Sequence, residues 1–247
     1  MRDYDIYYKR MFGNIDEKTD WVISELEKGR IKSVVDFGCA NGKTTEFLAS
    51  LFPKTNFIGV EKEVFVKQLK KENIFKNIRY ESNLKNVPFR GSLLFLSSVL
   101  HELFTFEKKP WELFDYFFES DVIIIRDMFY GYKEQNSFFS KEASNDLERQ
   151  FLESLKKEQF TDKDFAHFLL KVEYLENWNS ELEENYFATP FDEIIKKAFL
   201  NNFVIEDDVK YTNAFIKERI KKKHRENYSK YAEYTHRKIK FRKVNNK

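Results

Sequence analysis

The stretch SVVDFGCANGKTTEFLASLFPKTNFIGVE, residues 33 to 61, decides the fold of this chain. It is typical of a short apolar strand, a turn broken by Gly38 and Gly42, a helix, and a second strand that ends on Glu61. Glycines let backbone approach a ligand closely, and the start of a helix offers N–H groups without partners. The pattern predicts a nucleotide-cofactor site; the alternative is an ordinary strand-to-helix turn followed by a surface acid.

The glycine spacing separates the kinds of nucleotide site. A phosphate-binding P-loop has four residues between its first glycine and the Gly-Lys-Thr, whereas three residues separate Gly38 from Gly42-Lys43-Thr44. A dinucleotide fingerprint needs glycines at 38, 40 and 43, where the chain has Gly38, Ala40 and Lys43. Neither phosphate-binding motif is therefore predicted.

What remains is an acidic-x-Gly-x-small-x-Gly pattern, made by Asp36, Gly38, Ala40 and Gly42, with Glu61 closing the next strand. In this the chain resembles the class I S-adenosylmethionine-dependent methyltransferases. The resemblance implies that the glycine loop lies along the cofactor and that Glu61 binds both ribose hydroxyls. It also implies S-adenosyl-L-methionine as the cofactor, although the middle glycine of the family pattern is Ala40 here. A ribose diol presents two donors that a carboxylate can accept.

Strand and helix signals alternate along most of the chain. Strands are expected at 33–37, 56–60, 77–82, 93–97, 121–126, 203–211 and 236–244, and helices at 15–29, 43–51, 64–71, 110–118, 190–200 and 214–230. The alternation predicts an α/β fold with a doubly wound, mostly parallel sheet, and the resemblance implies seven strands with the last one antiparallel.

Residues 133 to 189 interrupt the alternation with an acidic, aromatic and helical stretch, in which Thr161 marks a helix start. We therefore expect a methyltransferase domain in two parts, 1–132 and 190–247, with a helical insertion at 133–189 that acts as a lid. Within the insertion, Tyr174 and Trp178 are candidate substrate-binding residues, with Tyr186 and Phe187 as further lining; the alternative for all of them is packing between helices.

The ends of the third and fourth expected strands carry further candidates, since ligands in such sheets bind beyond the carboxyl ends of the strands. The resemblance implies that Ser82 and Asn83 meet the adenine ring, where the Asn83 side-chain oxygen can accept a hydrogen bond from the exocyclic amine. Both residues are also ordinary turn formers. Ser97 at the end of the fourth strand is assigned to the same cofactor site.

His101 and Glu102 follow the fourth strand in the sequence SSVLHEL and form the candidate catalytic pair. A histidine that titrates near neutrality can take a proton from a hydroxyl or carboxylic acceptor, and a carboxylate can orient an amine. The alternative is that His101 caps or packs against the next helix. The Asn-Pro-Pro motif of base-amine DNA methyltransferases is absent, so that resemblance is not supported.

Arg126 and Asp127 end the fifth strand and are candidate substrate-binding residues, because strand-end charges face the crevice of the sheet. The alternative is that they pair with each other.

Charge is distributed unevenly, although the chain as a whole carries only +2. Residues 217–247 contain thirteen Lys or Arg residues against three Glu, a net charge of +10. A basic face of this kind can meet nucleic acid, an acidic partner or a membrane surface, and of these we expect nucleic acid rather than a membrane. The alternative is a solvated helix beside an exposed strand whose alternate residues point to water.

Composition points to a soluble protein, expected in the cytoplasm. The chain has a single cysteine, Cys39, which excludes an internal disulfide and is expected to be a small filler in the loop. We see no signal peptide, and the longest nearly apolar run, residues 92–100, is too short to span a bilayer. No metal site is predicted, and the oligomeric state is left open.

Three functions are consistent with the sequence. The first is methyl transfer to a small molecule under the helical lid. The second is methylation of RNA or another acidic polymer recruited by the basic tail. The third is a cofactor-binding partner subunit without catalysis. The sequence contains no motif that identifies the acceptor.

Overall fold

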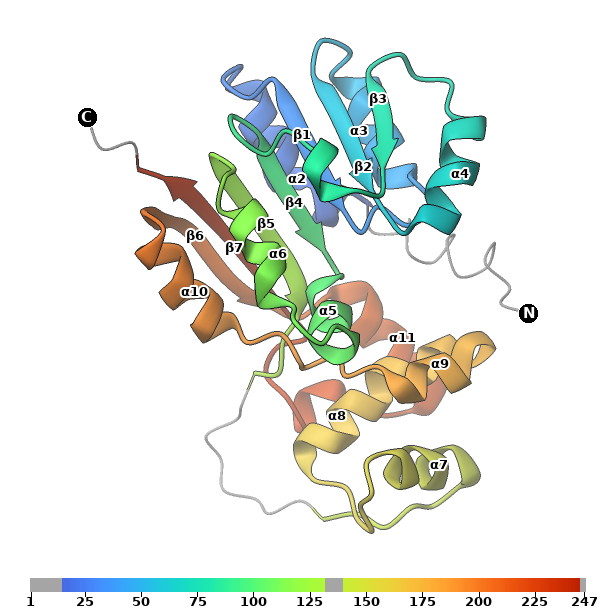
Figure 1. Ribbon diagram of the computed structural model, residues 1–247. Helices are drawn as coiled ribbons and strands as arrows, with labels where there is room; N and C mark the ends of the chain where they lie inside the picture. The colour runs from blue at the N-terminus through green and yellow to red at the C-terminus, as the bar shows by residue number, and fades with distance from the viewer. Residues whose placement is uncertain (1–14, 132–139, 245–247) are drawn as a thin grey trace.

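The computed structural model describes residues 15–131 and 140–244, and its centre is one seven-stranded sheet with the order β3-β2-β1-β4-β5-β7-β6 (Figure 1). The strands are β1 (Ser33–Phe37), β2 (Asn56–Val60), β3 (Ile78–Glu81), β4 (Leu93–Ser97), β5 (Val122–Met128), β6 (Phe203–Tyr211) and β7 (His236–Lys243).

Six of these strands run in one direction, and only β7 is reversed. Parallel pairing joins β3, β2, β1, β4 and β5, while β7 is antiparallel to both of its neighbours, β5 and β6. The predicted fold class is therefore confirmed. The chain order reverses between β1 and β4, which is where such sheets form a crevice for ligands.

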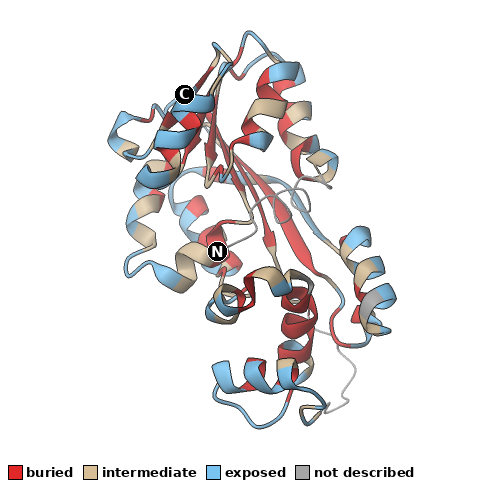
Figure 2. Ribbon diagram, turned by 90° about the vertical axis from the view of Figure 1, so that its right-hand side faces the viewer, coloured by how far each residue is buried: buried red, intermediate tan, exposed pale blue. Residues whose placement is uncertain are grey.

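Two layers of helices cover the sheet and divide the core in two. One layer packs on the face that carries Val34 and Phe57, and the other on the face that carries Val35 and Ile58. Figure 2 shows the buried strands between these layers. Neighbouring residues of a strand point to opposite faces, so continuous apolar runs were needed to bury both. The first layer comprises α2 (Ile15–Glu27), α3 (Lys43–Leu51) and α4 (Glu63–Glu72), and the second α5 (Leu100–Phe106), α6 (Trp111–Phe117) and α10 (Phe191–Leu200).

A helical cap lies at the carboxyl ends of the parallel strands (Figure 1). It has a core of its own, rich in phenylalanine, and the helix start predicted at Thr161 is present as a capping box with Asp164. The cap consists of α7 (Asp146–Ser154), α8 (Asp162–Lys171), η2 (Val172–Asn177) and α9 (Trp178–Glu183), together with α11 (Ala214–His224) and η3 (Tyr228–Lys230). Residues of the predicted insertion supply most of the cap, and α11 and η3 of the C-terminal segment complete it.

The C-terminal strand β7 lies between two other strands, so the alternative of an exposed, water-facing strand is wrong. Its cations are buried and paired: Arg237 with Asp208, Lys238 with Asp20, and Lys240 with Asp207. Sheet pairing hides both edges of the strand, and acidic side chains from β6 and α2 satisfy the charges. Much of the basic tail is therefore neutralised within the fold.

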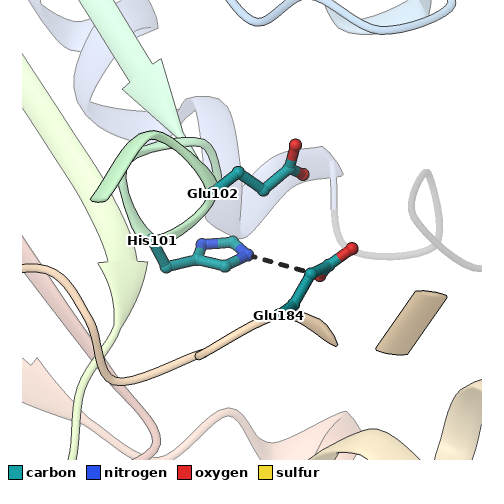
Figure 3. A group of neighbouring side chains, drawn as sticks. All are labelled: His101, Glu102 and Glu184. Carbon is teal, nitrogen blue, oxygen red and sulfur yellow. Dashed lines mark ion pairs between the residues drawn. The ribbon is translucent and has the colours of Figure 1, made fainter. Parts of the chain in front are cut away.

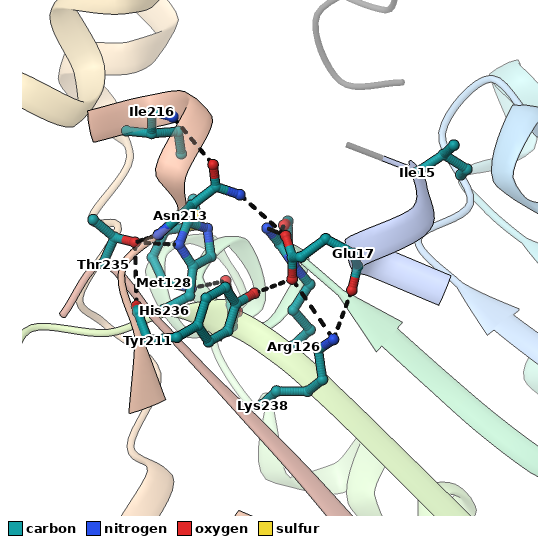
Figure 4. Close-up of polar contacts among 12 residues, drawn as sticks. Ile15, Glu17, Arg126, Met128, Tyr211, Asn213, Ile216, Thr235, His236 and Lys238 are labelled. Carbon is teal, nitrogen blue, oxygen red and sulfur yellow. Dashed lines mark hydrogen bonds and ion pairs between the residues drawn. The ribbon is translucent and has the colours of Figure 1, made fainter. Parts of the chain in front are cut away.

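Glu17 in α2 is the acidic centre of a polar cluster that joins three elements distant in sequence (Figure 4). Its carboxylate accepts hydrogen bonds from Arg126 of β5 at 2.9 and 3.2 Å, from Asn213 at 3.0 Å, and from the Tyr211 hydroxyl. Lys238 of β7 donates to the Glu17 carbonyl oxygen at 2.6 Å. Arg126 is 3% exposed, so its charge is stable there only because Glu17 pairs with it.

Among the described residues, no helix combines the length and apolarity that crossing a bilayer requires.

Replacing Glu17 with alanine should destabilise the protein strongly. The substitution leaves a buried guanidinium without its anion, and breaking such a pair costs about 3 to 5 kcal/mol. Urea unfolding followed by circular dichroism measures the change. The matched control is Glu63→Ala, which breaks an exposed pair with Lys67 and should cost no more than about 1 kcal/mol. Equal losses for the two variants would contradict the assignment.

Candidate functional site

The loop after β1 has the strained backbone that its glycines predict. Gly38 and Gly42 both have φ of +74°, and Ala40 between them has φ of +49°. A Cβ atom on Gly38 would lie 2.4 Å from a methyl carbon of Val99, in the loop after β4. The two loops at the crevice thus touch, and only glycine permits the contact at position 38.

Glu61 at the end of β2 turns back onto this loop. One carboxylate oxygen accepts a hydrogen bond from the Ala40 N–H at 3.1 Å, and the other from the Lys62 N–H at 2.8 Å. Each oxygen keeps a further lone pair for a ligand hydroxyl. The structure therefore brings the predicted loop and the predicted ribose ligand together.

Asp36 has a more internal position than the sequence suggested. Its carboxylate is buried and accepts a 2.6 Å hydrogen bond from the Thr45 hydroxyl of α3. Burial raises the pKa of this carboxyl to about 6. Asp36 therefore fixes the glycine loop indirectly, because its hydrogen bond to Thr45 joins the end of β1 to the helix that follows the loop.

Two polar groups of this region lie buried without a hydrogen-bond partner among the described residues: the Ser97 hydroxyl at the end of β4 and the Tyr80 hydroxyl of β3. Tyr80 packs under the glycine loop, since a Cβ on Gly42 would lie 2.5 Å from its oxygen. An orphaned buried hydroxyl is costly, so each is a candidate for a ligand contact. Ser97 was predicted for the cofactor site; Tyr80 was not, because nothing in its local sequence distinguishes it from an ordinary strand residue.

Ser82 and Asn83 are exposed just after β3. The Asn83 side-chain oxygen accepts a hydrogen bond from the Lys85 N–H at 3.0 Å and so caps the short helix η1 (Leu84–Asn86). Their role toward an adenine ring stays a prediction.

His101 is held rigidly at the start of α5 by the Asp127 carboxylate of β5. One Asp127 oxygen contacts His101 Nδ1 at 2.7 Å, and the other accepts the His101 backbone N–H at 2.8 Å. The Tyr186 ring packs edge-on against the imidazole. Asp127 also accepts hydrogen bonds from Thr189 and the Met128 N–H. Hydrogen bonds within the protein thus occupy both oxygens of the Asp127 carboxylate. Asp127 therefore orients His101 and neither faces the substrate pocket nor pairs with Arg126.

The Asp127 contact decides which imidazole nitrogen is available. A carboxylate beside Nδ1 favours the tautomer that carries its proton there, which leaves the Nε2 lone pair outward. Burial lowers the pKa of His101, but the charge of Asp127 and its hydrogen bond outweigh this effect, so that the net pKa is raised. The pKa of Asp127 is lowered, because the interactions with His101 and the backbone N–H groups exceed the cost of its burial.

Glu102 and Glu184 converge with His101 on one point (Figure 3). His101 Nε2 lies 3.9 Å from a Glu184 oxygen, and one ligand atom from each of the three residues lies within 4.8 Å of the others. Burial, and then the nearby Glu184 charge, raise the pKa of Glu102, although His101 opposes this. The predicted pair His101 and Glu102 is therefore adjacent, and the structure adds Glu184, which no local pattern in its acidic stretch could have singled out.

A pocket next to this cluster is lined both by strand ends and by the cap. Arg126 and Tyr174, both predicted for substrate binding, line it. Arg126 reaches it while paired with Glu17, and it donates to the Ser98 hydroxyl at 2.8 Å. Trp178 does not belong to the pocket: it is buried in the cap core, and its indole N–H donates to Gln150. The alternative of helix packing is therefore the correct one for Trp178. Further lining comes from Ser98, His101, Glu102, Leu170, Glu184, Tyr186 and Phe215.

No protein-family model and no curated protein matches this sequence. Solved structures do match the fold. One is the plantazolicin methyltransferase BamL in complex with a triazolic desmethylPZN analog and SAH, with a TM-score of 0.53, 15% identity, and coverage of 97% of this chain and 88% of that chain. Another is the methyltransferase domain of bacterial CtHen1-C, with a TM-score of 0.53, 12% identity, and coverage of 94% and 100%. The chain therefore has the class I S-adenosylmethionine-dependent methyltransferase fold.

Replacing Gly38 with alanine should destabilise the loop far more than the same change at Gly29. Both glycines have positive φ, but a Cβ at Gly29 meets nothing within 4 Å, whereas at Gly38 it overlaps Val99. Backbone strain alone predicts a loss of about 1 to 2 kcal/mol for Gly29→Ala, and strain plus overlap about 2 to 5 kcal/mol for Gly38→Ala. Chemical unfolding of both variants measures the difference. Indistinguishable stabilities would contradict the close contact between the loops.

Proposed function

We propose that this protein is an S-adenosylmethionine-dependent methyltransferase that acts on a small molecule held under the helical cap. The observation that carries the proposal is the joint placement of two sites at one edge of the sheet. The glycine loop with Glu61 lies at the ends of β1 and β2, and the His101–Asp127 pair lies after β4 and β5. Cofactor and acceptor would therefore meet across the crevice.

The residues at the glycine loop fit the cofactor. Glu61 keeps lone pairs for a ribose diol, Gly38 and Ala40 expose backbone at the crevice, and the Ser97 hydroxyl lacks a partner among the described residues. The neighbour BamL was crystallised with SAH, which supports the same class of ligand. Bound there, the cofactor would supply a methyl group on an electrophilic sulfonium.

The acceptor side of the proposal depends on enclosure. The pocket beside His101 is lined by Leu170, Tyr174 and Tyr186 of the cap as well as by residues at the strand ends. Such walls suit a compact molecule with apolar or aromatic parts. They also exclude water from a reaction that needs little beyond alignment of acceptor and methyl group.

His101 is the base in this proposal. Asp127 fixes the ring, and Nε2 is directed at the space between Glu102 and Glu184 (Figure 3). A proton-bearing acceptor in that space gives its proton to Nε2 when the bond to the methyl group forms. Asp127 stabilises the resulting imidazolium, as a buried carboxylate does beside any catalytic histidine.

The small-molecule proposal is favoured over an RNA substrate by the fate of the basic tail. Cations of β7 pair with acids of the fold, so within the described residues the exposed part of the basic tail is confined to the segment from Lys217 to Lys230. Helix α11, which carries the first part of this segment, belongs to the cap, and Phe215 on it lines the pocket.

Adenosylhomocysteine should raise the melting temperature of the protein, and Glu61→Ala should abolish the shift. The alanine removes the carboxylate that accepts the ribose hydroxyls and supports the Ala40 N–H. Differential scanning fluorimetry measures both effects. Glu63→Ala is the control, because this exposed glutamate on α4 pairs with Lys67 and should leave the shift unchanged. Absence of any shift in the parent protein would refute the cofactor assignment.

Transfer of labelled methyl groups into the small-molecule fraction of a cell extract should fall about 100-fold or more in His101→Ala. Ribonuclease treatment of the extract should have no effect. The base must be neutral, so the rate should increase as pH rises through the pKa of His101, which the neighbouring Asp127 charge raises above the ordinary histidine value. Asp127→Asn removes the charge that raises this pKa and should move the increase to lower pH. Full activity in His101→Ala would refute the assignment of the base. Methyl label that disappears from the product when the extract is treated with ribonuclease would refute the small-molecule acceptor.

A further inference from the structure

We infer that the reacting group of the acceptor is a primary amine, bound as its ammonium ion by His101, Glu102 and Glu184. The inference rests on the proposed function and extends it, since neither the sequence nor the fold names the acceptor atom. It depends on three properties of this acceptor cluster: the hydrogen-bonding character of its atoms, their spacing and their charge.

The cluster offers hydrogen-bond acceptors to the pocket. Because Nδ1–H of the neutral His101 ring donates its hydrogen bond to the Asp127 carboxylate, the ring presents only the lone pair of Nε2 to the pocket. Glu102 and Glu184 each present a carboxylate oxygen within 4.8 Å of the corresponding atom of the other and of His101. A primary ammonium is the complementary group, because it has three N–H donors and no lone pair. A hydroxyl has a single O–H donor to share among the three acceptor atoms.

The spacing of the three atoms accommodates an ammonium nitrogen. Charge-assisted N–H···O bonds are about 2.8 Å long, so the partners of one tetrahedral nitrogen lie roughly 4.6 Å apart. The cluster has one separation of 3.9 Å and none above 4.8 Å. Metal bonds of about 2.1 Å would place ligand atoms roughly 3.0 to 3.4 Å from one another. The 3.9 Å separation of His101 Nε2 and Glu184 lies between these two spacings, so a metal-addition measurement separates the two ligands.

The charges around the cluster also favour a cation. Two carboxylates face the same point, and their mutual repulsion is relieved by a positive ligand. The basic residues that border the pocket compensate this negative charge little. Arg126 is already paired with Glu17, and burial lowers the pKa of Lys18 to about 7, which reduces its positive charge near neutral pH. Lys171 near Glu184 donates to its backbone carbonyl, and burial lowers the pKa of this lysine to about 8.

The same geometry allows the amine to be activated. An ammonium nitrogen has no lone pair, so it must lose one proton before it can attack, and His101 Nε2 is the acceptor placed for that proton. The freed nitrogen pair then forms the bond to the methyl carbon, while the carbon–sulfur bond breaks and its electron pair stays on sulfur. The product is a methylated ammonium ion, adenosylhomocysteine and a protonated His101, which returns its proton to solvent.

Matched pairs of probes test the inference directly. Phenethylamine and butylamine are compared with 2-phenylethanol and butanol, because each pair differs only in the reacting group and the apolar bodies suit a pocket lined by Leu170, Tyr174 and Phe215. Binding is measured by ligand-observed NMR on the full chain in EDTA, with and without adenosylhomocysteine. The arm without the nucleoside reports on the cluster even if the cofactor assignment fails.

We expect each amine to bind at least about tenfold more tightly than its alcohol, and Glu184→Gln and Glu102→Gln to reduce this preference about tenfold. Glu183→Gln is the matched control: it removes the same charge from the adjacent exposed residue, outside the cluster, and should retain the preference. Thermal unfolding of each variant shows that it is folded.

Two results would overturn the inference. The first is alcohols that bind as tightly as amines, or an amine preference that survives in Glu184→Gln. The second is a melting temperature that Zn²⁺ or Mn²⁺ raises in the parent protein but not in Glu184→Gln, with no response to the amines; the cluster would then be a metal site. A protein that shows the amine preference but no adenosylhomocysteine binding would refute the proposed function and leave the amine site in place.

Discussion

The buried carboxylate of Asp127 is the interaction on which the arrangement of the site depends. It lies at the end of β5 and accepts hydrogen bonds from the ring and backbone of His101, from Met128 and from Thr189. A carboxylate this deeply buried is stable only when its lone pairs are satisfied. Satisfying them ties the start of α5 and the end of the cap segment to the central sheet.

This constraint explains how a rigid sheet can present a precise site through short loops. The imidazole cannot rotate without breaking a charged hydrogen bond, so Nε2 stays directed at Glu102 and Glu184. Thr189 anchors the segment that carries Glu184 to the same carboxylate. Glu17 does the equivalent for α2, pairing with Arg126, the residue before Asp127. Adjacent side chains of β5, on opposite faces of one strand, thus fix the two sides of the crevice.

The sequence predicted the fold well because its signals are local. Each signal lies within one short stretch of sequence: an apolar run marks each parallel strand, and the glycine loop and Glu61 mark the cofactor site. The structure has each of them where it was expected. Predictions failed where long-range pairing decides. Asp127 was assigned to substrate and Trp178 to the pocket, yet each is enclosed by residues far away in the chain.

The sequence by itself determined which segments form strands, where the cofactor loop lies and that a histidine follows β4. It could do so because apolar periodicity and the backbone conformation at glycines depend on neighbours in the chain. Only the tertiary structure decided what surrounds that histidine. Asp127 is 26 positions away from His101 along the chain, and Glu184 reaches the cluster only through the folding of the cap. The chemistry of the site is a property of acceptors converging in space, which no spacing along the chain encodes.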